Sequence, residues 1–191
     1  MSVTASTADG NEPAWIGAVL GFWFEELSES QWFAKDAALD AQIRQRFLST
    51  HEQVVANGAA DVSGPRAMLA AVIVLDQFSR NLLRRDPRAF ASDAIARRIS
   101  AAAIEQGFDA AMSREERMFL YLPYEHSEDR ADQARSLELT QSLGNESWTN
   151  FARAHKEIID RFGRFPHRNA ILNRQSTAAE IEFLRGPMAS F

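Results

Sequence analysis

Apolar residues recur at steps of three and four along nearly the whole chain, and no stretch shows the sustained apolar–polar alternation of a half-buried strand. One series runs through Leu39, Ile43, Phe47, His51 and Val54, which would share one face of a helix. This spacing predicts an all-α fold. Short turns between the expected helices indicate about eight helices in irregular, stacked antiparallel hairpins, either a solenoid or a bundle.

The length and the ends of the chain suggest a simple domain organisation. A chain of 191 residues suits one domain with a core that needs no cross-link, and the absence of cysteine excludes disulfides and thiolate chemistry. We expect residues 1–12 to be a flexible lead-in and residues 13–191 a single helical domain, because Pro13 suits the first position of a helix. The longest apolar run, Ala67 to Leu75, is too short to cross a bilayer, and no signal peptide is visible. We therefore expect a cytoplasmic protein without membrane contact.

Local signals predict where several helices begin and end. Ser113 and Thr177 each start a capping box, with a glutamate three residues later that returns a hydrogen bond to the cap. Gly163 favours the left-handed backbone that ends a helix. The helix that follows Ser113 should break before Pro123, because proline removes a backbone donor from a helix interior.

The four histidines lack the spacing of a metal site, and no HExxH sequence is present. Two of them fall on apolar stripes and are expected to be core histidines with one satisfied nitrogen. No glycine-rich phosphate loop and no GxSxG elbow occurs either, so we expect neither a metal nor a cofactor. The two core candidates are His51 and His155, and the stripe of the second contains Trp148, Phe151, Ile158 and Phe162.

The net charge of −5 hides two basic blocks. Residues 65–107 and 147–191 each carry seven basic and four acidic residues, whereas the other segments are acidic. A mostly acidic surface repels a polyanion, so we do not expect an extended nucleic-acid interface. The blocks contain the runs "RNLLRRDPR" and "RFGRFPHRN", which would form a positive pocket in an acidic surface if the fold brings them together.

Three polar segments, "LDQFSRN", "YEHSE" and "RFGRFPHRN", are each expected at a helix end. Asp76 directly follows the apolar run, near the predicted C-terminal end of a buried helix, where burial and the helix dipole both disfavour its charge. It therefore requires a cationic partner. Arg80, one turn later, and the arginines after Gly163 are the candidates, because a guanidinium matches a carboxylate and stays charged when buried.

The segment "RFGRFPHRN" is predicted to close this polar cluster. Gly163 and Pro166 frame a loop whose phenylalanines, Phe162 and Phe165, would be wedged into the core. We expect this anchoring to hold a guanidinium against a buried carboxylate. The predicted pair joins Arg164 or Arg168 to Asp76 or Glu128.

The same cluster has a structural and a functional interpretation. In the structural one, it is an ion-pair latch that joins distant hairpins and has no ligand. In the functional one, it binds an anion. The candidate ligand-binding residues are then Arg80, Asn81, Arg164, Arg168 and Asn169. The candidate catalytic residues are Asp76, His126, Glu128 and His167.

The chain resembles the bacterial proteins gathered as domain-of-unknown-function family nine-two-four, which are assigned to the tetratricopeptide-like superfamily. The resemblance covers almost the whole chain and rests on long runs: "VLGFWF", "WFAKDAALD", "LDQFSRNLLRRDPRAFASDAIA", "RMFLYLPYEHSED" and "RFGRFPHRNAILNRQSTAAEIEFL". It implies a helical fold and no reaction. The family pattern has proline where Ser79 stands and glycine where Asn173 stands, so we expect the helix to run past Gln77 and the turn at Asn173 to survive.

Two classes of function remain open. The first is a tetratricopeptide-like binding module whose groove holds an acidic peptide or a small phosphorylated or carboxylated ligand. The second is an enzyme in which arginines orient a small anionic substrate and a histidine transfers a proton with the help of a carboxylate. A pocket that is open only at one end, with a histidine facing it within hydrogen-bond range of a carboxylate, would favour the enzyme. A long open groove lined with exposed aromatics would favour the module. The sequence does not predict the ligand or the oligomeric state.

Overall fold

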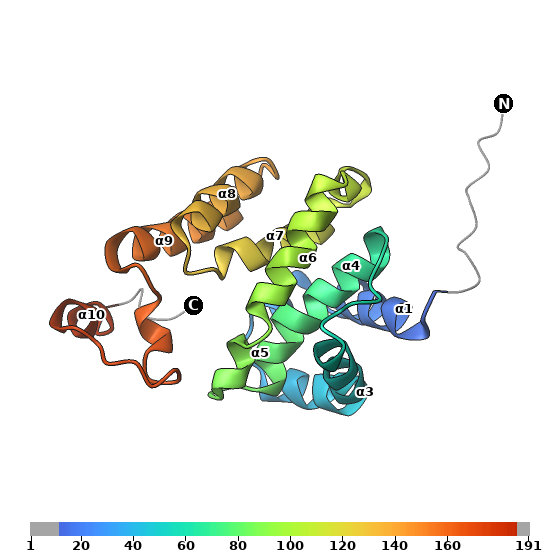
Figure 1. Cartoon of the computed structure of the whole chain (residues 1–191), viewed down its shortest axis with the longest axis horizontal. Helices are drawn as coiled ribbons and strands as arrows, with labels where there is room; N and C mark the ends of the chain where they lie inside the picture. Colours follow the sequence, from blue (N-terminus) through green and yellow to red (C-terminus); the bar gives the residue numbers. More distant parts are fainter. Residues whose placement is uncertain (1–11, 187–191) are drawn as a thin grey trace.

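The computed structural model of the protein describes residues 12–186 (Figure 1). No strand occurs in this range and helices dominate it, which confirms the predicted all-α fold of about eight helices. The α-helices are α1 (Ala14–Gly21), α2 (Glu29–Trp32), α3 (Ala37–Ala56), α4 (Pro65–Val72), α5 (Ser79–Leu82), α6 (Asp93–Glu105), α7 (Arg114–Glu125), α8 (Arg130–Gln141), α9 (Glu146–Phe162) and α10 (Ala178–Phe183). Shorter elements are the π-helical η1 (Phe22–Glu26) and η2 (Ile73–Phe78) and the 3-10 turns η3 (Pro87–Phe90), η4 (Phe108–Ala111) and η5 (Pro166–Arg168).

Helix ends that depend on local chemistry lie where the sequence predicts them. Ser113 and Thr177 both form complete capping boxes, at the starts of α7 and α10. Gly163 ends α9 with a φ of 70°, and Asn173 adopts the expected left-handed backbone with a φ of 53°. Pro13 is the residue before α1 rather than its first residue. These ends follow from contacts within one turn, which a sequence displays directly.

Two predicted helix ends were wrong. Pro123 lies inside α7, which continues to Glu125. The helix that begins at Pro65 runs through η2 into α5, so Asp76 lies in the middle of a helical run instead of near its end. The expected continuation of the helix past Gln77 is confirmed. The Ser79 hydroxyl forms two buried hydrogen bonds, with its oxygen 2.8 Å from His51 Nε2 and 3.0 Å from Ser92 Oγ.

The main core is apolar and aromatic. The rings of Trp23, Phe78 and Phe119 are fully buried, and Trp23 meets the other two edge-on at centroid distances of 5.7 and 5.3 Å. Edge-to-face pairs of this kind contribute about 0.5–1.5 kcal/mol each beyond their buried area. Trp23 thus joins the helical run from α4 to α5, which carries Phe78, to helix α7, which carries Phe119. Asp76 of the candidate site lies on the same run, and His126 directly follows α7.

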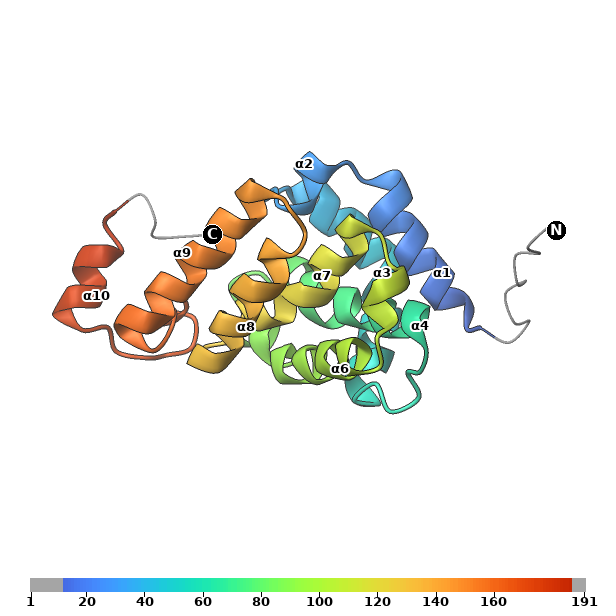
Figure 2. The same cartoon turned by 90° about the horizontal axis from the view of Figure 1, so that it is seen from above.

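A second, smaller core holds the C-terminal helices. It contains Ile158, Ile159 and Phe165, and Phe162 packs against it from α9. Figure 2 shows α8, α9 and α10 at one end of the molecule, with α1 and α4 at the other. The only error in the predicted α9 stripe is Phe151, whose exposed fraction is 53 %.

His155, on the same stripe, is 6 % exposed, which confirms its predicted burial. Between residues 12 and 186 there is no helix that combines the length and the apolar character needed to cross a bilayer. Most of the predicted lead-in, residues 1–11, lies outside the described residues. The division into a lead-in and a single domain stays a prediction.

Candidate functional site

Asp76 is the buried centre of the polar residues, with a side chain that is 1 % exposed. Its Oδ1 lies 3.0 Å from Arg80 Nη1 and 2.8 Å from His126 Nδ1, and its Oδ2 accepts a hydrogen bond of 2.5 Å from Gln77. Burial acts against the charge, but Arg80 and His126 outweigh it and hold the pKa of the Asp76 carboxyl well below its usual range. The carboxylate is therefore ionised at neutral pH.

The backbone around Asp76 is π-helical, a rare geometry that is frequent at functional sites. One turn later, Arg80 points back and donates to the Asp76 backbone oxygen at 2.7 Å. Arg80 also forms a bidentate pair with Asp93 of α6, at 3.0 Å for each nitrogen. Burial raises the pKa of Asp93 in spite of this cation, so the pair joins two helices at some cost in desolvation.

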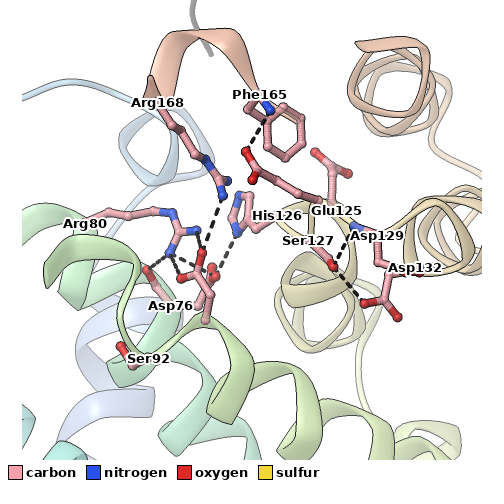
Figure 3. A network of polar contacts seen from close by, with 12 residues as sticks. Asp76, Arg80, Ser92, Glu125, His126, Ser127, Asp129, Asp132, Phe165 and Arg168 are labelled. Carbon is pink, nitrogen blue, oxygen red and sulfur yellow. Dashed lines mark hydrogen bonds and ion pairs between the residues drawn. The ribbon is translucent and has the colours of Figure 1, made fainter. Parts of the chain in front are cut away.

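His126 follows the last residue of α7 and presents an imidazole beside Asp76 (Figure 3). A carboxylate can only accept, so Nδ1 carries the proton and Nε2 is left as a basic lone pair. Burial, and then the charge of Arg80, lowers the pKa of His126, which keeps the ring neutral at pH 7. Figure 3 shows the second ring nitrogen on the side of Arg168, away from Asp76.

Arg168 comes from η5, far along the chain, and is 6 % exposed. Its guanidinium lies between two rings, 4.7 Å from the centroid of Phe90 and 4.5 Å from that of Phe165. The nearest carboxylate oxygen, Oδ2 of Asp93, is 3.7 Å from Nη1, which is longer than a hydrogen bond. Within residues 12–186 the guanidinium donates no hydrogen bond, and its Nε is buried without a partner. Burial, together with Arg80, lowers the pKa of Arg168 to about 10.

Glu128 attaches the C-terminal segment to the end of α7. Its carboxylate accepts a hydrogen bond of 2.7 Å from the Phe165 backbone N–H and pairs with Arg174 at 2.6 and 2.9 Å. Burial acts against the charge, but these contacts lower the pKa of Glu128 overall. These contacts fix the position of Phe165, whose ring packs on Arg168.

A cavity of about 450 Å³ lies beside these groups. It is bounded by η3, α6, the end of α7 and the segment after Phe165. Its apolar wall consists of Pro87, Phe90, Ala91, Ala94, Pro123 and Leu172, and its polar wall of Asp93, Arg97, His126, Ser127, Glu128, Asp132 and Arg168. We call Asp76, Arg80, Asp93, His126 and Arg168 the polar junction, because they join the main core to the C-terminal helices.

A second buried acid lies behind the junction. The Glu125 carboxyl is 3.2 Å from His155 Nδ1, and its other oxygen has no hydrogen-bond partner among the described residues. Burial, and then the negative charge of Asp76, raises the pKa of Glu125 to about 8, while burial lowers the pKa of His155 to about 3. Both groups are neutral at pH 7, so this contact is not an ion pair.

Four of the residues that the sequence singled out converge, and two clearly do not. Asp76, Arg80, His126 and Arg168 meet in the junction, so the two basic blocks of the sequence do come together. The predicted positive pocket was wrong, because the cavity beside them is lined by more acidic than basic side chains. The other two turn elsewhere. Asn81 donates to Asp40 at 2.8 Å, and Arg164 pairs with Glu180 at 2.6 Å.

The predicted ion pair of the C-terminal loop was wrong in its partners. Arg164 and Arg168 were expected against Asp76 or Glu128, but Glu180 pairs with Arg164, and Asp93 is the acid nearest to Arg168. The cause is the turn from Gly163 to Pro166, which sends the two arginines in different directions.

Two further candidates lie beside the cavity without lining it. Asn169 is buried and braces the loop, because it donates to Ser176 and accepts from Arg174, both at 3.0 Å. His167 stacks near Phe165 with centroids 5.5 Å apart, and burial lowers its pKa to about 4. Both residues shape the loop that carries Arg168.

Sequence reasoning missed Asp93 and Arg174. Asp93 lies in the first turn of α6, where an acidic residue is ordinarily explained by the helix dipole, so its sequence gives no sign of a buried role. Arg174 follows the left-handed Asn173 and replaces the predicted partners of Glu128. Among the residues that the structure describes, no three His, Asp or Glu side chains are grouped so as to hold a metal ion.

The fold and the junction define an all-helical protein with a buried Asp–Arg–His cluster beside a cavity. The chain belongs to a family described as bacterial protein of unknown function (DUF924), whose model matches residues 19–188. It is also similar to a solved structure, that of the protein of unknown function ATU0120 from Agrobacterium tumefaciens. The identity is 38 % and the TM-score 0.85, over 91 % of this chain and 98 % of the other. Among curated proteins, none matches the chain. Membership of the tetratricopeptide-like superfamily stays a prediction.

Proposed function

We propose that the cavity beside the polar junction binds a small anionic ligand. One observation carries this proposal: Arg168 is a buried guanidinium that lines the cavity and donates no hydrogen bond within residues 12–186. The other arginines near it, Arg80 and Arg174, are engaged with carboxylates at 2.6–3.0 Å. An anion at Arg168 would supply the acceptors that the protein does not.

The surroundings of Arg168 are suited to binding as well as to stability. Two phenylalanine rings fix the guanidinium, so little side-chain entropy would be lost when a ligand binds. Burial strengthens each charge-assisted hydrogen bond because the local dielectric constant is low. A latch, by contrast, would place its cation in direct contact with the acid that it neutralises.

The test is a thermal-shift comparison of the parent protein with Arg168→Gln, using acetate, benzoate and inorganic phosphate as probes. A probe at a hundred times its dissociation constant should stabilise the parent by about 2.7 kcal/mol. We expect this shift to disappear in Arg168→Gln, because the fork that binds the anion is gone.

Arg164→Gln is the matched control, because Arg164 lies in the same segment but faces Glu180. It should retain the anion-induced shift. If Arg168→Gln lowers the melting temperature sharply and no probe shifts the parent, the junction is a latch and the proposal is refuted.

A second candidate function, acid–base catalysis on a small anion, is favoured by the pair formed by Asp76 and His126. A neutral imidazole with Nδ1 held by a buried carboxylate presents Nε2 as a general base, and His126 lines the cavity with Arg168. The imidazole beside a carboxylate and the position of His126 at the cavity support the enzyme alternative. The arginine would orient the substrate and the histidine would take a proton from it.

Pyruvate in deuterated water provides a test of this candidate, because loss of its methyl protons reports proton abstraction beside a carbonyl. The parent should exchange these protons faster than His126→Gln at equal occupancy. Equal exchange rates with pyruvate bound at Arg168 would show that His126 is not a base toward it.

A further inference from the structure

The charges around the cavity limit how much negative charge a ligand can bring. Three carboxylates line it, from Asp93, Glu128 and Asp132, against two guanidiniums, from Arg97 and Arg168. His126 is neutral at pH 7, because its pKa is lowered by burial. The wall therefore already has an excess of one negative charge.

The cations at or behind this wall other than Arg168 are already paired with carboxylates of the protein. Arg80 holds Asp76 and Asp93, Arg174 holds Glu128, and Arg97 lies 3.3 Å from Asp132. Within residues 12–186, Arg168 forms no hydrogen bond with a carboxylate, and the closest one, that of Asp93, is already paired with Arg80. A ligand with two charges, such as a phosphate monoester, would meet one open guanidinium and several carboxylates, and like charges at close range oppose binding.

The shape of the open donor also selects among anions. Phe90 and Phe165 lie 4.7 and 4.5 Å from the Arg168 guanidinium and hold it in one orientation. A guanidinium edge fixed in this way matches the two coplanar oxygens of a carboxylate in a bidentate pair.

The rest of the wall fits an apolar body. Phe90, Pro123 and Leu172 line the cavity beside Arg168, and its volume of about 450 Å³ lies in the range of small-molecule sites. Burial of a ligand's hydrocarbon against these side chains would add affinity in proportion to the area covered.

From these features we infer that the ligand is a compact organic monocarboxylate, bound by its carboxylate to Arg168 and by an apolar body to Phe90, Pro123 and Leu172. This inference rests on the proposed anion site and names its ligand class. It excludes phosphorylated metabolites and highly acidic peptides as the preferred occupants.

The experiment compares benzoate with phenyl phosphate, which share an apolar body, and each with acetate and inorganic phosphate, which lack one. Dissociation constants are measured by isothermal titration calorimetry at pH 7.5 in the parent, Arg168→Gln, Arg168→Lys and Arg164→Gln proteins. We expect benzoate to bind at least about tenfold more tightly than phenyl phosphate, because the second charge is unmatched. Benzoate should also exceed acetate by about tenfold or more.

The variants assign these preferences to particular groups. Arg168→Gln should lose benzoate binding, Arg164→Gln should keep it, and Arg168→Lys should weaken it because an ammonium lacks the planar fork. Leu172→Ala should weaken the binding of benzoate and leave the affinity for acetate unchanged, because it removes part of the apolar wall.

Three outcomes would overturn parts of the argument and can be told apart. If phenyl phosphate binds as tightly as benzoate, and both need Arg168, the anion site stands and the monocarboxylate inference is wrong. If none of the four probes binds, the proposed function itself fails. Binding that persists in a folded Arg168→Gln protein refutes both, because the ligand then lies elsewhere.

Discussion

The main core and the polar junction lie side by side but are stabilised in opposite ways. In the core, Trp23, Phe78 and Phe119 make many weak contacts, none of which depends on the charge of a neighbour. In the junction, Asp76 is tolerable only because Arg80 and His126 surround it. The same helical run supplies both regions, since Phe78 and Asp76 are two residues apart on it.

The two regions differ in whether their own residues complete them. Side chains fill the volume of an apolar core, so it leaves no space for a ligand. A charged junction is complete only when every donor has an acceptor, and Arg168 does not meet that condition among residues 12–186. The group that is left open in the junction is therefore the one to examine for binding.

The largest expected effect is that of Asp76→Ala. Removal of this carboxylate leaves the Nδ1 hydrogen of His126 buried without its acceptor and takes from Arg80 one of its two carboxylate partners, so the free energy of unfolding should fall by about 3–5 kcal/mol. Urea unfolding followed by circular dichroism measures this loss. A loss below about 1 kcal/mol would place Asp76 among solvated surface pairs and erase the contrast between the two regions.

Leu75→Ala is the matched variant on the core side, because Leu75 is adjacent and fully buried. It should cost about 2–5 kcal/mol by leaving a cavity. Its folded fraction should bind benzoate as the parent does, whereas Asp76→Ala should change the affinity through the altered charge balance. Glu182→Ala, which removes an exposed pair with Arg185, serves as the baseline for both.

A smaller effect is expected from pH, through Glu125. Burial and Asp76 raise the pKa of Glu125 to about 8 in the folded protein, from 4.5 as the usual value. Between these values the unfolded chain has released a proton that the folded protein keeps, so stability falls as pH rises toward 8. The slope reaches about 1.4 kcal/mol per pH unit.

The unfolding free energies of the parent and of Glu125→Gln, each measured at pH 7 and pH 8, isolate this group. The pKa values of His126, His155 and His167 are lowered from 6.5, so the unfolded chain still releases protons from these rings as pH rises, and this opposing contribution is the same in both proteins. Glu125→Gln should flatten the slope. A slope that persists in this variant would assign the titration to another group in the junction.

The smallest expected effect concerns the loop that carries Arg174. Asn173 has a φ of 53°, so Asn173→Ala should lower stability by about 1 kcal/mol through left-handed strain, and Asn173→Gly should stay within about 0.5 kcal/mol of the parent. Thermal unfolding of both variants gives the comparison. Equal stability of the two would mean that the loop relaxes and that Glu128 does not need this turn to meet Arg174.

The fold was largely predictable because its signals are local. The capping box at Ser113 and the glycine at Gly163 act within one turn, and the apolar spacing acts within one helix. Pro123 was misjudged because packing keeps α7 helical around it: both Pro123 and its neighbours are buried. Propensity was outweighed there by tertiary contacts.

The sequence predicted several residues of the site correctly, but it did not predict which of them form ion pairs with one another. Burial of Asp76 follows from the apolar run before it, and its need for Arg80 follows from elementary electrostatics. Which arginine, Arg164 or Arg168, enters the junction depends on how its loop packs against Asp93, which lies 75 residues before Arg168 in the chain. No local sequence pattern predicts such a long-range contact. Asp93 itself resembled an ordinary first-turn acid.

The cavity takes its parts from widely separated stretches of the chain, and this sets the order in which it comes into being during translation. Asp93 and His126 leave the ribosome before Arg168 and Leu172, and domains fold from their N-terminal parts as synthesis proceeds. The main core is therefore in place while the cavity still lacks one wall. A nascent chain that stops short of Arg168 has the aromatic core but lacks the guanidinium on which the proposed site depends, so that site would be completed only after the main core has formed.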